Sequence, residues 1–312
     1  MKLIIQIPCF NESQTLQQTL AALPREMAGF DVVEWLVIDD GSSDNTSEVA
    51  QANGVDHVVR HTCNLGLARA FMTGLDACRH QGADVIVNTD ADNQYDASYI
   101  SALVAPILAG EADLVVGARP VGEIKTFSPT KKVLQRFGSW VVRKVSNTNI
   151  PDAPSGFRAL SKEAALHTNV FSNYTYTLET IIQAGQKKLA ITSVAVGVNG
   201  FLRPSRLMKS TFSYVWRSLF SIVRIFMIYK PFLLLGTVSL IMSFLGILLG
   251  CRFLYFFFNG HGDGHIQSLI LTSLLIMLGI LIGCIAFISD LLAANRKQLE
   301  EVQYLLRKNN IK

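Results

Sequence analysis

The stretch VIVNTDADNQY, residues Val85–Tyr95, joins an apolar run to two carboxylates. The run Val85–Asn88 is predicted to be a buried strand that ends just before the acids. One small residue separates Asp90 from Asp92, and alternate residues of an extended segment point to the same side. Two like charges this close repel unless a cation lies between them, and hard oxygen ligands suit Mg²⁺ or Mn²⁺. The stretch predicts a cation site, although a D-x-D pattern alone would favour a solvated acidic turn.

The flanking sequence alternates between strand and helix patterns. The expected strands are Lys2–Ile7, Val32–Ile38, Val58–Arg60, Ala83–Asn88 and Asp113–Gly117. The expected helices run from a cap at Asn11 or Ser13 to Leu23, from Asp44–Thr46 to the Asn53-Gly54 pair, from Asn64 to Gln81, and over Tyr99–Leu108. Strands and helices that alternate through short loops predict an α/β fold with a mostly parallel sheet.

Several polar loops follow these strands directly. In open sheets of this kind, ligands bind beyond the carboxyl ends of the strands. The loops that we expect to converge there are Pro8–Glu12, Asp39-Asp40, Asn64–Arg69 and Asp90–Gln94. They predict one site at one edge of the sheet.

The sequence lacks the usual glycine-rich phosphate loops. It contains neither GxxxxGK[ST] nor a strand-linked GxGxxG, which argues against a P-loop ATPase and a dinucleotide-binding oxidoreductase. A nucleotide site built from carboxylates and a metal is what remains. Asp39 or Asp40 would accept hydrogen bonds from a base or ribose, whereas a turn with a helix cap is the simpler interpretation of this segment taken alone.

Together these motifs resemble family-2 glycosyltransferases, which have the GT-A fold, a Rossmann-like nucleotide-diphospho-sugar transferase fold. The resemblance covers about residues 3–230 and rests on five segments in order: Ile7–Glu12, Val37–Asp44, Asn64–Gly66, Asp90–Gln94 and Asp152–Arg158. The last, DAPSGFR, is similar to the D-x-x-S-G-F motif of the polyprenyl-phosphate hexose synthases, typified by dolichyl-phosphate mannose synthase.

The resemblance implies roles for individual residues. For the nucleotide-sugar it implies Pro8, Phe10, Glu12, Asp39, Asp40, Asn64, Asp90 and Ala91. For Mg²⁺ or Mn²⁺ it implies Asp90, Asp92 and Gln94. For catalysis it implies Asp92, Asp152 and Arg119, with Asp152 beside the transferred sugar.

Basic residues are the candidates for binding an acceptor phosphate. They are Arg119, Lys132, Arg136, Arg203, Arg206 and Lys209. Segment Val121–Arg143 fits the family loosely and leaves the choice among Lys131, Lys132 and Arg136 open. The cations of Arg203–Ser210 could bind an acceptor phosphate, and the same charges could instead bind anionic lipid headgroups.

Two apolar runs, Phe232–Phe258 and Ile266–Ile288, are long enough to span a bilayer, which takes about 20 residues. Their connector, Asn259–His265, lacks Lys and Arg, whereas the outer flanks are basic. The positive-inside rule then predicts a multi-pass hairpin in the cell membrane with both termini and the catalytic domain in the cytoplasm. The five scattered cysteines predict reduced thiols rather than a disulfide framework.

The expected domain organisation has four parts. Residues 1–210 form the catalytic domain, 211–230 an amphipathic helix, 231–289 the transmembrane pair and 290–312 a cytoplasmic helix. Polar residues at helical spacing in Thr211–Tyr229 favour a position in the membrane interface over packing in a core. Glycines in the apolar runs permit close helix packing, which leaves homo-oligomerisation open: Gly236, Gly246, Gly250, Gly279 and Gly283.

The expected function is inverting transfer of one hexose from a UDP- or GDP-sugar to undecaprenyl or dolichyl phosphate at the cytoplasmic membrane face. The Q-x-x-R-W motif of processive polysaccharide synthases is absent, which favours transfer of a single sugar. One alternative is transfer to a lipid hydroxyl, with Asp152 as general base. Others are a non-enzymatic nucleotide-sugar sensor and, less favoured, a transporter. The expected partners are the donor, the lipid acceptor and the bilayer, with no nucleic acid.

Overall fold

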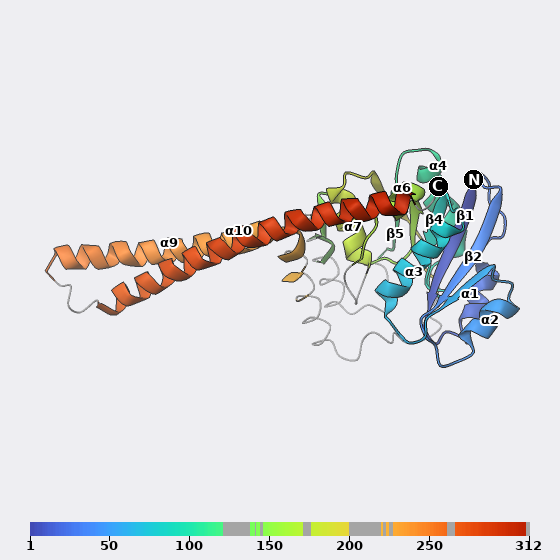
Figure 1. Cartoon of the computed structure of the whole chain (residues 1–312), viewed down its shortest axis with the longest axis horizontal. Helices are drawn as coiled ribbons and strands as arrows, with labels where there is room; N and C mark the ends of the chain where they lie inside the picture. Colours follow the sequence, from blue (N-terminus) through green and yellow to red (C-terminus); the bar gives the residue numbers. More distant parts are fainter. Residues whose placement is uncertain are drawn as a thin grey trace. The chain divides into compact units, whose positions relative to one another are not determined.

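The computed structural model describes residues 1–120, 146–170, 176–199, 227–260 and 266–309, with short stretches at 138–140, 142–143, 220 and 223–224. The chain forms two compact units (Figure 1). The first comprises Met1–Ser218 together with Val302–Lys312, and the second comprises Leu219–Glu301.

The first unit is built on a mixed sheet in which seven strands lie in the order β3-β2-β1-β4-β6-β5-β7. The strands are β1 Lys2–Cys9, β2 Val32–Asp39, β3 His57–Arg60, β4 Val85–Asn88, β5 Leu114–Ala118, β6 Arg158–Ser161 and β7 Ile191–Ala195. The pairs β1–β2, β1–β4, β2–β3 and β5–β7 are parallel. Strand β6 is antiparallel to both β4 and β5.

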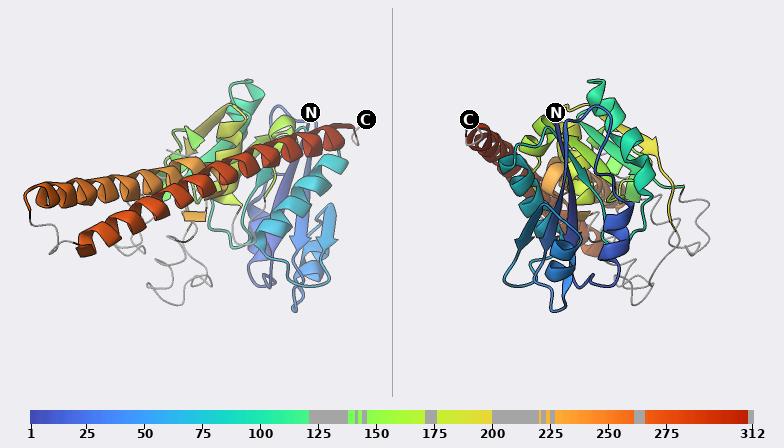
Figure 2. Two further views of the ribbon diagram at one scale, coloured as in Figure 1. Left: turned by 60° about the vertical axis from the view of Figure 1, so that its left-hand side comes forward. Right: turned by 90° about the vertical axis from the view of Figure 1, so that its right-hand side faces the viewer.

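Helices cover both faces of this sheet (Figure 2). They are α1 Leu16–Ala22, α2 Thr46–Ala52, α3 Leu67–His80, η1 Ala97–Tyr99, α4 Ile100–Leu108, α6 Lys162–His167 and α7 Thr177–Gln186. Alternate strand residues such as Ile5 and Val87 form the main core with α1 and α4. On the other face α3 packs so closely that a side chain at Gly74 would meet Gln6 and Ile38.

The predicted α/β architecture is confirmed, with corrections. Strands β6 and β7 were not predicted. Helix α1 does not begin at Asn11 or Ser13 but at Leu16, after Thr15. The reason is local, because Asn11 has a left-handed φ of 56° and its side-chain oxygen accepts a hydrogen bond from the backbone of Ser43.

The second unit contains helix α9, Pro231–Phe258, and most of α10, Ile266–Asn309. Both helices are long and apolar enough to cross a membrane. Within the unit, Ser239 Oγ donates to the Gly279 carbonyl at 2.7 Å, and added side chains at Gly246, Gly250 and Gly283 would meet the facing helix. Four of the five predicted packing glycines thus serve the α9–α10 contact, whereas a side chain at Gly236 would meet Phe232 of its own helix.

The end of α10 belongs to the first unit and packs on α6. The Tyr304 ring stacks on His167 with 3.9 Å between centroids, and its hydroxyl donates to Glu163 at 2.8 Å. Arg307 donates to the carbonyls of Leu166 and Thr168. One helix, α10, runs unbroken from Ile266 to Asn309, and the division of the chain into a transmembrane part and a cytoplasmic part at residue 290 stays a prediction.

Candidate active site

The carboxyl ends of β1, β2 and β4 meet, as the alternation of strands and helices predicts. Cys9 lies opposite Asp39 and Gln6 opposite Asn88 in the parallel registers. Pro8 is still paired with Ile38 of β2, but its missing N–H faces the β4 side, where the pairing ends at Gln6, so β1 tolerates the proline. The loops that follow these strands therefore open at a common edge.

Asp90 and Asp92 occupy the turn after β4. Burial, and next the charge of Asp92, raise the pKa of Asp90 to about 7 against the opposing influence of Arg119. One oxygen of Asp92 accepts a hydrogen bond from the backbone N–H of Gln94 at 3.2 Å. The turn thus concentrates negative charge that the protein itself neutralises only in part.

Gly156 forms the floor beneath Asp90. A side chain at Gly156 would lie 3.0 Å from Asp90 Oδ1 and 3.0 Å from the Tyr176 hydroxyl. The Gly156 N–H donates to the Tyr95 hydroxyl at 2.9 Å, and its carbonyl accepts from Asn88 at 2.8 Å. Buried polar groups therefore hold the backbone of the DAPSGFR motif against the acid pair.

Asp39 and Asp40 are both buried, and each has partners within the protein. Asp39 accepts from the Ser42 N–H at 2.8 Å and from Ser47, and Arg60 Nε lies 3.5 Å away. Asp40 accepts from two backbone N–H groups, those of Leu65 and Gly66, at 2.9 and 2.8 Å. Binding of a nucleotide by these carboxylates stays a prediction.

His61 also contacts Asp40, and the sequence analysis did not single it out. Its Nδ1 lies 2.7 Å from Asp40, and its Nε2 lies 3.0 Å from the Thr73 hydroxyl. Asp40 and His61 thereby fix the loop that carries Asn64 to the start of α3. A histidine one residue after a strand end was the available signal.

The other predicted nucleotide residues differ in exposure. Phe10 is 41% exposed, and its contact with a nucleotide stays a prediction. Asn64 is exposed as well. Glu12 is buried and accepts from the Thr15 hydroxyl at 2.8 Å. Ala91 is buried, and its carbonyl accepts from the Thr19 hydroxyl at 2.9 Å.

Asp152 and Arg119 form a buried two-pronged ion pair. Arg119 Nε lies 2.7 Å from Asp152 Oδ2, and Nη2 lies 3.1 Å from Oδ1. The Arg119 backbone N–H points to the same carboxylate at 3.2 Å. Both carboxylate oxygens therefore accept from Arg119, a pairing of two predicted catalytic residues that the sequence did not predict.

Arg158 is fully buried in the same motif and was given no role by the sequence analysis. It donates to the carbonyls of Ser155 and Ala153, each at 2.8 Å, and to the Thr180 hydroxyl. Burial lowers its pKa to about 10. The arginine ties the turn after Asp152 to α7, which explains why a charged residue begins strand β6.

Several predicted acceptor residues lie outside the described residues. They are Lys131, Lys132, Arg136, Arg203, Arg206 and Lys209. Most of the amphipathic segment Thr211–Tyr229 lies outside them as well. These assignments stay predictions.

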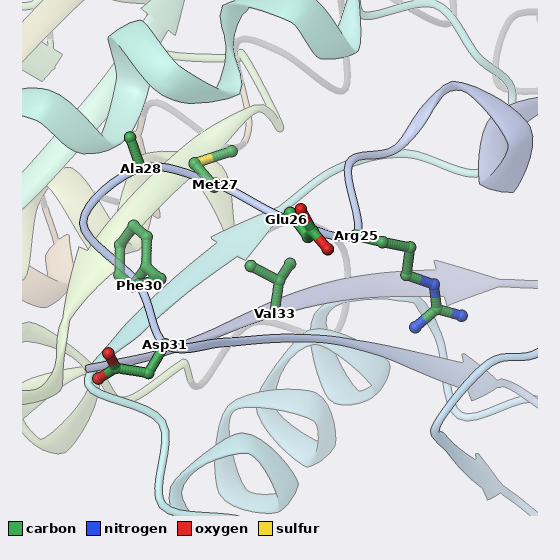
Figure 3. Close-up of a pocket in the computed structure, with 7 residues that line it drawn as sticks. All are labelled: Arg25, Glu26, Met27, Ala28, Phe30, Asp31 and Val33. Carbon is green, nitrogen blue, oxygen red and sulfur yellow. The ribbon is translucent and has the colours of Figure 1, made fainter.

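A cavity of about 450 Å³ lies at the opposite end of the sheet (Figure 3). It is lined by Arg25, Glu26, Met27, Ala28, Phe30, Asp31 and Val33. These residues belong to the loop that enters β2 and to the start of that strand, so the cavity is remote from the carboxyl edge.

Comparison with known proteins agrees with this geometry. Residues 4–167, more than half of the chain, match the family model described as glycosyl transferase family 2. The chain belongs to this family. The matched range contains the acid pair, Arg119, Asp152 and Gly156. The family assigns the chain to the sugar-transferring enzymes.

Two curated relatives act on lipid phosphates, according to their names. An undecaprenyl-phosphate mannosyltransferase of Micrococcus luteus is 31% identical over 165 residues, covering 51% of this chain and 66% of the relative. A UDP-N-acetylglucosamine–dolichyl-phosphate N-acetylglucosaminyltransferase of Methanococcus voltae is 29% identical over 211 residues, covering 61% of this chain and 82% of the relative. Their names give different sugars.

The fold is also that of a solved glycosyltransferase. Glucosyl-3-phosphoglycerate synthase from Mycobacterium tuberculosis, in complex with Mn²⁺, UDP and glucosyl-3-phosphoglycerate, aligns with a TM-score of 0.53 at 24% identity. The alignment covers 71% of this chain and 79% of that one. The similarity establishes a GT-A type fold for the first unit.

Proposed function

We propose that this glycosyltransferase moves one hexose from a UDP- or GDP-sugar to a polyprenyl phosphate in a reaction that needs Mg²⁺ or Mn²⁺. Lipid-phosphate acceptors in the names of both curated relatives support the acceptor class. The observation that carries the proposal is the Arg119–Asp152 pair, because it bears on what kind of acceptor the site can activate.

A hydroxyl acceptor needs a base to remove its proton, and Asp152 is the predicted candidate. Both of its oxygens accept hydrogen bonds from Arg119, so Asp152 would have to give up part of this pairing to take a proton from an acceptor hydroxyl. A phosphate monoester is already anionic near neutral pH and needs no proton removed. The geometry therefore favours a phosphate over a lipid alcohol.

The acid pair fits a hard divalent cation. Among the described residues no three His, Cys, Asp or Glu side chains gather into a complete metal site. Mg²⁺ sites in nucleotide-dependent enzymes use one or two carboxylates and complete their coordination with substrate phosphates and water. Asp90 and Asp92, with Gln94 beside them, supply that partial set, and the raised pKa of Asp90 shows the electrostatic strain that a cation would relieve.

In the proposed reaction, an acceptor phosphate oxygen attacks the anomeric carbon while the bond to the nucleoside diphosphate breaks. The leaving oxygen takes the electron pair, and direct attack inverts the anomeric centre. A bound cation would stabilise the negative charge of the leaving diphosphate. Asp152 holds the Arg119 guanidinium in place, and the arginine N–H groups not used in that pair can bind the acceptor phosphate.

We further propose that the chain works at the cytoplasmic face of the cell membrane. Helices α9 and α10 are long and apolar enough to anchor it in a bilayer, where polyprenyl phosphates reside. This anchoring would supply the acceptor without release of the lipid to water.

The test uses the full chain in lipid nanodiscs with Mn²⁺ and a panel of UDP- and GDP-sugars. Undecaprenyl phosphate and undecaprenol are offered in parallel, and products are identified by mass spectrometry. We expect a hexosyl-phosphoryl lipid from the phosphate and no product from the alcohol. Transfer to undecaprenol would support the hydroxyl alternative, and nucleotide binding without any transfer would support the sensor alternative.

A further inference from the structure

The turn Asp90–Tyr95 is held from two sides by residues distant in the sequence. On one side, the Thr19 hydroxyl in α1 donates to the Ala91 carbonyl at 2.9 Å. On the other, the Asn199 side-chain amide donates to the Asn93 carbonyl at 3.1 Å. The Asn199 backbone N–H also donates to the Gln94 carbonyl at 2.8 Å.

The turn needs such support for two reasons. Asn93 has a left-handed φ of 54°, a conformation that side chains other than glycine adopt less readily. Asp90 and Asp92 also repel one another across Ala91. Since Ala91 lies between the two acids, its carbonyl fixes their relative orientation.

We propose that Thr19 and Asn199 are positioning residues that hold Asp90 and Asp92 in the geometry that receives the divalent cation. This inference rests on the proposed metal-dependent function. Thr19 is 3% exposed, so its hydroxyl is shielded from water and the hydrogen bond is well placed to restrain the backbone. Neither side chain touches the cation in this proposal, because each acts through a backbone carbonyl of the turn.

The test measures Mn²⁺ binding to the purified full chain by electron paramagnetic resonance, with UDP or GDP at a fixed concentration supplying the phosphates in place of the sugar donor. Thr19→Val keeps the side-chain shape and removes the hydroxyl, and Asn199→Leu removes the amide. We expect each variant to bind Mn²⁺ about fivefold more weakly, the factor that one net hydrogen bond is worth. Thr19→Ser restores the hydroxyl and should restore the affinity.

Thr168→Val is the matched control. Thr168 is also buried and donates its hydroxyl to the Ala164 carbonyl at 2.8 Å, but it lies at the end of α6. Its loss should leave Mn²⁺ affinity unchanged. Thermal unfolding of every variant identifies any that fail to fold.

Turnover gives a second measurement that a purely structural role would not reproduce. Thr19→Val should raise the Mn²⁺ concentration for half-maximal turnover, whereas kcat at saturating Mn²⁺ should stay within about twofold, since one lost hydrogen bond weakens binding of the metal. Wild-type affinity in folded Thr19→Val and Asn199→Leu would overturn the inference alone. Absence of Mn²⁺ binding by the wild-type chain would overturn the proposed metal site, and this inference with it.

Discussion

The two ends of the central sheet treat charge in opposite ways. At the amino end, Asp31 pairs with the N-terminal amine of Met1, and this hydrogen-bonded amine lowers the Asp31 pKa. Arg25 there pairs with Asp56, and its guanidinium lies 3.4 Å from the centre of the Trp35 ring. These charges have partners and contribute to structure.

At the carboxyl end, by contrast, Asp90 and Asp92 lie close together, and their charges oppose one another. Asp90 is partly buried beside Asp92, and its pKa rises to about 7. The cavity of Figure 3 lies at the amino end of the sheet. A search for the functional site by cavity volume would therefore select a different region than a search by crowded charges. Perturbed ionisation in a cluster of acids is the better guide to a functional site.

The largest expected effect comes from removing one carboxylate at the carboxyl end. A metal ion contributes several kcal/mol to leaving-group stabilisation, so Asp92→Asn should lower turnover by about 10³-fold. Asp96→Asn is the control at the same end, since Asp96 caps η1 through the Ser98 N–H. Glu26→Gln, in the cavity at the amino end, should leave turnover within about twofold, as ordinary surface substitutions do. Transfer of a radiolabelled sugar measures the turnover of all three variants. Equal turnover of Asp92→Asn and the wild type would contradict the claim that the carboxyl end, and not the amino end, contains the catalytic charge.

Next in size is the effect of filling the space beneath Asp90. Gly156→Ala places a methyl group 3.0 Å from Asp90 Oδ1 and from the Tyr176 hydroxyl, so these groups must shift by a few tenths of an ångström. Because misplacement by about 1 Å costs on the order of 10²-fold in rate, this smaller shift should lower the rate by between about tenfold and 10²-fold. The turnover rate and the Mn²⁺ affinity should both be lower than in the wild type. Gly236→Ala is the control, because the added methyl group would lie at an ordinary van der Waals distance of 3.7 Å from Phe232. Unchanged kinetics in Gly156→Ala would show that the space at Gly156 does not constrain Asp90.

The pH dependence should be smaller and has a definite sign. Because the folded pKa of Asp90 lies above its ordinary value, the carboxyl keeps its proton below about pH 7. Mn²⁺ must displace that proton, so its affinity should fall by about tenfold per unit as pH drops below 7. For the same reason, ionisation of Asp90 should destabilise the metal-free fold as pH rises through about 7. Mn²⁺ titrations and thermal unfolding at pH 6, 7 and 8 measure both effects, and a flat Mn²⁺ affinity would contradict the assignment.

The smallest expected effect is at Asp31. Its pKa is lowered, so its pairing with Met1 is present above the ordinary aspartate pKa and is lost only as pH falls below it. Asp31→Asn should therefore leave both the turnover and the pH profile between 6 and 8 unchanged. A change in that profile would mean that charge at the amino end also tunes the site.

Much of the architecture was predictable because it follows from local patterns. The strand Val85–Asn88 and the acids after it appear where the apolar run and the loop chemistry place them. The two long apolar helices also follow directly from composition. Strand β6 was missed because Arg158-Ala159-Leu160-Ser161 has no strand alternation and begins with a charged residue. That residue is buried only because Ser155, Ala153 and Thr180 supply acceptors.

The sequence by itself determined that acids follow parallel strands and that the C-terminal third contains two helices of membrane-spanning length. Only the tertiary structure decided that Asp152 forms an ion pair with Arg119, that Gly156 lies against Asp90, and that the end of α10 packs on α6. The reason is physical. Hydrophobic periodicity and turn chemistry act between neighbours in the chain, whereas these contacts join residues 33, 66 and 141 positions apart and exist only once the sheet has brought them together.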